Sequence, residues 1–104
     1  LEHVKDISMA KGDVVVLDQA NLLVSGATAA DIIYTIEELP SFGWLVKGAE
    51  VLKQGSRFSQ LDIDLNNIVF IHDGNATGTN NVILTARDRA GAILENIILK
   101  IVAN

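Results

Sequence analysis

The stretch that decides the fold is residues 80–102, NNVILTARDRAGAILENIILKIV, in which two apolar runs flank a turn at residues 88–91. Side chains in both runs alternate with period 2, which is the pattern of half-buried β-strands. The alternation predicts a hairpin whose core face holds Val82, Leu84 and Ala86 from the first strand and Ile97, Leu99 and Ile101 from the second. Lys100 then points to water.

The rest of the chain has the punctuation of an all-β domain. Eight glycines are scattered between short segments, and Pro40 is the single proline. Residues 14–17 and 68–71 are short apolar runs rich in β-branched side chains, which favour strands. In the second run we expect Val69 and Ile71 to enter the core. These features predict a β-sandwich or a β-barrel.

One stretch, residues 28–39, can be read in two ways. Thr28 with Asp31 has the form of a helix capping box, and apolar residues at helical spacing follow it. Five of the six residues 32–37 are β-branched or aromatic, which favours a strand instead.

Composition excludes several classes of function. The chain has 104 residues, a net charge of −5, no cysteine and two histidines. Its acidity argues against nucleic acid as a partner, and no apolar run is long enough to insert directly into a membrane. Zinc sites built from cysteine or from three histidines are excluded. We expect residues 1–8 to be a flanking segment or a remnant of cloning, and residues 9–104 to be a single domain.

A series of short motifs follows in a fixed order along the chain. They are Tyr34-Thr35-Ile36, Pro40, Phe42-Gly43-Trp44-Leu45, Phe58-Ser59-Gln60-Leu61-Asp62-Ile63, Ile68-Val69-Phe70-Ile71-His72-Asp73-Gly74 and Ala86-Arg87-Asp88-Arg89-Ala90-Gly91. This order resembles the chondroitin sulfate proteoglycan (CSPG) repeat, a cadherin-like module. The resemblance covers about residues 21–102, and its most specific part is FSQLDI followed by IHDG.

The resemblance implies an immunoglobulin-like Greek-key β-sandwich of about seven strands, in which residues 32–36 form a strand. Modules of this family usually stand in tandem arrays on extracellular or cell-surface proteins. They act as spacers and as adhesion or matrix contacts, with neighbouring repeats as partners, and catalysis is not associated with them. We therefore expect a non-catalytic repeat of a larger surface protein.

Calcium is the one cofactor that the resemblance suggests, and Asp62, Asp64 and Asp88 are the candidate ligands. The sequence departs from the family pattern at residues 25–28 and 80–81, where acidic residues are common in the family and absent here. In the alternative interpretation, Asp62 and Asp64 cap a turn by accepting bonds from backbone amides.

Other side chains invite functional interpretations of differing strength. His72 ends a strand beside Asp73, and we expect it to bridge two loops rather than to serve with Ser59 in catalysis, because no strained nucleophile turn is present. Trp44 should face away from buried Leu45, where it is either packed against a loop or exposed as an anchor for a glycan or protein ligand. Asn75 begins the sequon Asn-Ala-Thr, a candidate glycosylation site.

Overall fold

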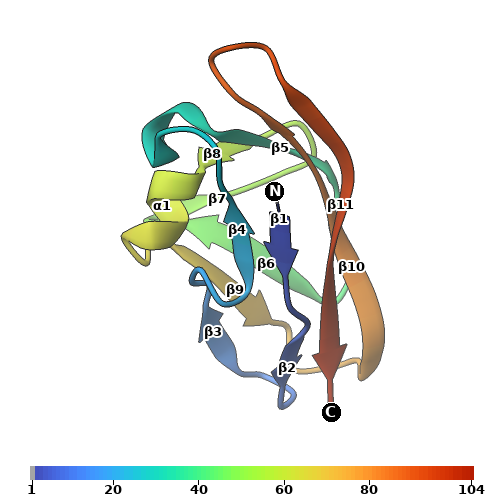
Figure 1. Ribbon diagram of the computed structural model, residues 1–104. Coiled ribbons are helices and arrows are strands. Elements are labelled where there is room, and N and C mark those ends of the chain that lie inside the picture. The colour runs from blue at the N-terminus through green and yellow to red at the C-terminus, as the bar shows by residue number, and fades with distance from the viewer. Residues whose placement is uncertain (1) are drawn as a thin grey trace.

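The chain forms two β-sheets packed face to face in the computed structural model, which describes residues 2–104 (Figure 1). Its strands are β1 (Glu2–Val4), β2 (Ile7–Met9), β3 (Val14–Val16), β4 (Leu22–Val24), β5 (Ile33–Glu38), β6 (Gly43–Lys47), β7 (Glu50–Val51), β8 (Arg57–Ser59), β9 (Ile68–His72), β10 (Gly78–Arg87) and β11 (Ile93–Ala103). A short 3-10 turn, η1 (Ala29–Asp31), and one helix, α1 (Gln60–Asp64), complete the described elements.

One sheet has the order β2-β11-β10-β5-β8, the other the order β3-β9-β6-β7, and β1 pairs separately with β4. The apolar core lies between the sheets and draws on both of them. The predicted all-β sandwich is confirmed. Several of its strand segments are only two or three residues long, so the structure divides the chain more finely than the seven strands we expected.

The predicted hairpin is confirmed as β10 and β11, which run along the length of the molecule (Figure 1). The side chains expected on its core face are buried, and Lys100 is exposed. One irregularity escapes simple alternation. Leu84 pairs with Ile97 while Ala86 pairs with Leu94, so β11 carries an extra residue. Asn96 has φ = 54° at this bulge, a conformation that asparagine tolerates better than most residues.

The ambiguous stretch contains a strand, as the resemblance implied. A single turn, η1, precedes β5, in which Tyr34 and Ile36 are buried between more exposed neighbours. The expected capping box does not form, because the Thr28 side chain makes no capping bond. Period-2 burial therefore prevails over the helical spacing of the same apolar residues.

The prediction for β9 was wrong by one residue. Ile68 and Phe70 are fully buried, whereas Val69 and Ile71 face outward and are half-buried. All four side chains are apolar, so the pattern alone gives no signal for the face. Packing decides it, because the ring of Phe70 lies where a Cβ on Gly43 would stand. Gly43 thus lets Phe70 enter the core.

The segment expected to flank the domain contains two paired strands. β1 pairs antiparallel with β4, and β2 pairs parallel with the end of β11. Ile7 and Met9 are buried in the core. The boundary at residue 9 therefore falls inside β2, and the strand pairing extends back to Glu2.

Candidate functional site

The FSQLDI motif forms the end of β8 and the helix α1. Ser59 is the N-cap of α1, and its hydroxyl accepts a hydrogen bond of 3.1 Å from the Asp62 amide. The Asp62 carboxylate in turn accepts bonds from the Ser59 amide, at 2.8 Å, and from the Ser59 hydroxyl, at 3.1 Å. These reciprocal bonds make a capping box. Lys47 Nζ lies 3.7 Å from the same carboxylate. Ser59 and Asp62 are thus engaged in holding the helix start.

The three carboxylates proposed from the sequence as calcium ligands have separate contacts. The Asp64 carboxylate accepts a hydrogen bond of 3.1 Å from the side-chain nitrogen Nε2 of Gln60, and the Asp88 carboxylate accepts one of 2.9 Å from the Ala92 backbone amide in the β10–β11 turn. Within residues 2–104, no group of three or more histidine, cysteine or acidic side chains is placed to hold a metal ion. This donor set does not fit a calcium site, and Asp62 follows the alternative interpretation as a cap.

Gln60 is the polar centre of the motif and is only 1% exposed. Its side-chain oxygen accepts a bond of 3.1 Å from the Val24 amide, and its side-chain nitrogen donates one of 3.1 Å to the Leu22 carbonyl. The Tyr34 hydroxyl donates to the same oxygen. Leu22 and Val24 present these groups on the edge of β4 that faces away from β1, since alternate residues of a strand point their backbone groups the same way. The amide therefore completes β4 as a neighbouring strand would.

Tyr34 shares this buried network. Burial raises the pKa of the Tyr34 phenol above its usual value, because the phenolate would lose its hydration inside the core. The Tyr34 and Phe58 rings also pack with their centroids 5.1 Å apart. The neutral phenol is thus the form that the fold requires.

We predict a loss of stability at alkaline pH that is specific to Tyr34. In the unfolded chain the phenol ionises near pH 10, before it does in the folded chain. Above about pH 10 the folded state therefore holds the extra proton, and this group should lower the free energy of unfolding by about 1.4 kcal/mol for each further pH unit. Denaturant unfolding of the wild type and Tyr34→Phe across this range measures the difference.

Tyr34 is the only tyrosine, so the near-ultraviolet phenolate band reports this group alone. The band should appear together with the loss of circular dichroism. A phenolate that forms near pH 10 in a chain that is still folded would contradict the assignment. Tyr34→Phe is the control, because it keeps every other titrating group.

His72 bridges two loops, as expected. Its Nδ1 accepts hydrogen bonds of 2.9 Å from the Gly12 and Gly74 amides, which leaves Nε2 to donate to the Ala76 carbonyl at 2.6 Å. Gly12 lies between β2 and β3, and the other two partners lie between β9 and β10. Both ring nitrogens are used in joining these loops.

Trp44 lies on the outer face of the second sheet and is 49% exposed. Cross-strand partners on this face are apolar throughout: Val14, Ile71 and Trp44 form one row, and Val16, Val69, Val46 and Val51 form the next. Leu45 points into the core, as the sequence predicted. About half of the Trp44 side chain is exposed, and its role as a ligand anchor stays a prediction. The sheet thus presents an apolar outer face.

Asn75 is exposed in the loop between β9 and β10. Its amide donates a hydrogen bond of 2.8 Å to the Asp73 carboxylate. The side chain is reachable, and glycosylation stays a prediction.

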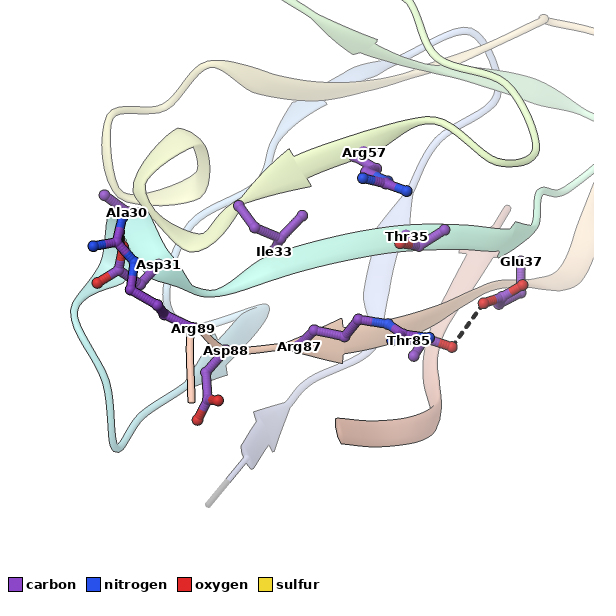
Figure 2. Close-up of a pocket in the computed structure, with 10 residues that line it drawn as sticks. All are labelled: Ala30, Asp31, Ile33, Thr35, Glu37, Arg57, Thr85, Arg87, Asp88 and Arg89. Atoms are coloured by element: carbon purple, nitrogen blue, oxygen red, sulfur yellow. Dashed lines mark hydrogen bonds and ion pairs between the residues drawn. The ribbon is translucent and has the colours of Figure 1, made fainter. Parts of the chain in front are cut away.

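A polar groove of about 690 Å³ lies on the outer face of the other sheet (Figure 2). Its floor consists of Ile33, Thr35 and Thr85, and its walls carry charges of both signs. The acidic side chains are Asp31, Glu37 and Asp88, and the basic ones are Arg57, Arg87 and Arg89. Sequence analysis missed this groove, because its members come from three separate segments. The available signal was that Thr35, Glu37, Thr85 and Arg87 occupy outward positions of β5 and β10.

The comparisons with known proteins agree with this architecture. A family model described as Cadherin-like matches residues 2–103, so the chain belongs to the cadherin-like family. Domains of that family are generally non-catalytic and typically extracellular. A search of curated proteins finds no significant match. Across residues 2–104, none of the helical segments has the length and apolar character to cross a bilayer.

Proposed function

We propose that this domain is a non-catalytic extracellular repeat of the CSPG type, which acts as a spacer and adhesion module in a larger surface protein. The observation that carries the proposal is the parallel pairing of β2 with β11. β2 follows β1 near the start of the sequence and runs in the same direction as β11, the last strand. If β2 and β11 were antiparallel, the last strand would return toward the end from which β2 starts.

The motif residues support a structural role. Ser59 and Asp62 cap α1, Gln60 completes β4, and His72 joins two loops. Phe58 and Ile63 are buried in the core. Each of these four polar side chains thus makes at least one hydrogen bond to the chain's own backbone. This use supports a scaffold rather than an enzyme.

Two copies joined head to tail test the spacer proposal. Because entry and exit run in one direction, we expect small-angle X-ray scattering to give a maximum dimension near twice the 42 Å long axis of one domain. Copies that fold back on each other, with a maximum dimension close to that of one domain, would contradict it.

Because Asp62, Asp64 and Asp88 have separate contacts, we propose that calcium binds only where a neighbouring repeat supplies further ligands. In the scattering experiment a chelator arm is therefore included. A single domain should unfold at the same temperature in calcium and in chelator, and a shift confined to the joined copies would assign the ligands to the junction. A shift in the single domain that Asp62→Asn removes would show that the capping carboxylate binds calcium instead.

The apolar outer face favours a second function, recognition of a glycan or protein ligand through Trp44. An exposed tryptophan set in a flat apolar row can stack on a sugar ring or anchor a protein contact. No other side chain on this face has an aromatic ring.

Trp44 is the only tryptophan, so its fluorescence reports binding at this face directly. We expect a ligand from a sugar panel to shift or quench the emission, and Trp44→Ala to weaken binding by about tenfold or more. Ile98→Ala is the matched control, because Ile98 is equally exposed but lies on the other sheet. A silent panel would remove glycans from consideration and leave protein ligands.

A further inference from the structure

All three arginines of the chain line the groove between β8, β5 and β10. Arg57 comes from β8, Arg87 from the end of β10, and Arg89 from the turn that follows. The five lysines are elsewhere. In a domain with a net charge of −5, all of the guanidinium groups thus lie along one groove.

The strand register places Arg57 and Arg87 on opposite sides of β5, with Thr35 between them. Arg57 pairs with Thr35 across β8 and β5, while Arg87 pairs with Ile33 one row along, on the opposite side of β5. Neighbouring strands are about 4.8 Å apart, so the two backbones are separated by about 10 Å across the sheet. Long arginine side chains span such a gap from both sides. In Figure 2 they flank Thr35.

These two guanidinium groups are not neutralised within the domain. Among the arginine and lysine side chains of residues 2–104, the ion pairs are Lys47–Asp62 and Arg89–Asp31, the last at 3.4 Å. Neither Arg57 nor Arg87 takes part in one. Glu37, at one end of the groove, accepts a hydrogen bond of 2.7 Å from Thr85. The centre of the groove is therefore basic, and both of its ends are acidic.

We propose that this groove binds a carboxylate side chain presented by a segment of a partner protein, between Arg57 and Arg87 and above Thr35. Arginine suits this task better than lysine, since its planar group donates two parallel bonds to a carboxylate. The Thr35 hydroxyl adds a donor on the floor. The inference deepens the adhesion role proposed above and rests on it only in taking the partner to be a protein.

The charges at the ends of the groove select among anionic ligands. At one end Arg89 pairs with Asp31 and leaves Asp88 as the unbalanced charge, and at the other end lies Glu37, so each end has a net negative charge that repels a ligand with closely spaced negative charges. A densely sulfated glycan would meet these carboxylates as soon as it extended past the two arginines. A peptide with one acidic residue between basic or neutral residues matches the charge order of the groove.

The test is a nuclear magnetic resonance titration of the whole domain with a short peptide that has a central glutamate and a lysine at each end. We expect shifts of the Arg57 and Arg87 side-chain resonances and of the Thr35 amide. The same peptide with glutamine at its centre should bind about tenfold or more weakly, because it loses charge-assisted hydrogen bonds.

Variants identify the residues responsible. Arg57→Gln and Arg87→Gln should each weaken binding by about tenfold, whereas Lys53→Gln, an equal change of charge at an exposed site outside the groove, should leave it unchanged. Equal weakening by Lys53→Gln would overturn the proposal in favour of non-specific attraction. Tighter binding of a heparin oligosaccharide at the same resonances would overturn it in favour of a glycan.

Absence of shifts with the glutamate peptide would overturn the groove as a carboxylate site while leaving the spacer proposal intact. The scattering result on joined copies does not depend on these arginines. Thermal unfolding of each variant confirms that it is folded, and both arginines are exposed, so their replacement should not disturb the core.

Discussion

The side-chain amide of Gln60, buried against β4, is the interaction on which the rest of the domain depends. β4 has only three residues and one strand partner, β1. Its other edge faces α1 inside the protein, where unpaired backbone groups would each cost about 1–3 kcal/mol. Gln60 satisfies an amide and a carbonyl on that edge at once. A single side chain thus replaces a strand.

The position of Gln60 depends on its neighbours in the motif. The capping box between Ser59 and Asp62 fixes the first turn of α1. As a result Gln60, the residue after Ser59, points at β4. The side chains of Ile63 and Phe58 are buried in the core and anchor this turn. The Tyr34 hydroxyl, on β5, donates a further hydrogen bond to the Gln60 side chain. Polar and apolar residues of the motif therefore act together to join a helix and two strands that belong to different sheets.

Because the polar side chains of the motif are engaged within the fold, the two outer faces are the surfaces that we propose for contacts with other molecules. They differ in chemistry. One sheet presents an apolar surface around Trp44, and the other presents a charged groove around Thr35. An adhesion-type domain with two such faces can contact different partners on its two sides.

Alternation fixed the β10–β11 hairpin from sequence because one face of each strand is clearly more polar. It could not orient β9, whose residues are apolar on both faces. There, contact between Phe70 and Gly43 decides the outcome. The capping box was visible in principle, as Ser59 followed by Asp62. Thr28 and Asp31 have the same spacing as Ser59 and Asp62, yet no capping bond forms there.

Neither the role of Gln60 nor the arginine groove could be predicted from the sequence, and the reason is the same for both. Each depends on groups distant along the chain, and nothing local marks them. Gln60 bonds to Val24 and Leu22, which lie 36 and 38 positions earlier in the chain. The groove combines residues of β8 with residues of β10. The calcium ligands Asp62, Asp64 and Asp88 were predicted from residue type and from the family resemblance. Those features cannot show that each carboxylate already has another contact.

Hydrogen exchange at the Val24 amide tests the central role of Gln60 most directly. Gln60→Met keeps the length of the side chain and removes its amide, with Leu61→Ala as the exposed neighbouring control. Relative to the Leu99 amide in β11, we predict that Gln60→Met lowers the protection of the Val24 amide by about tenfold or more. An unchanged ratio of the two protection factors would contradict the account, because the Val24 amide would then be protected without Gln60.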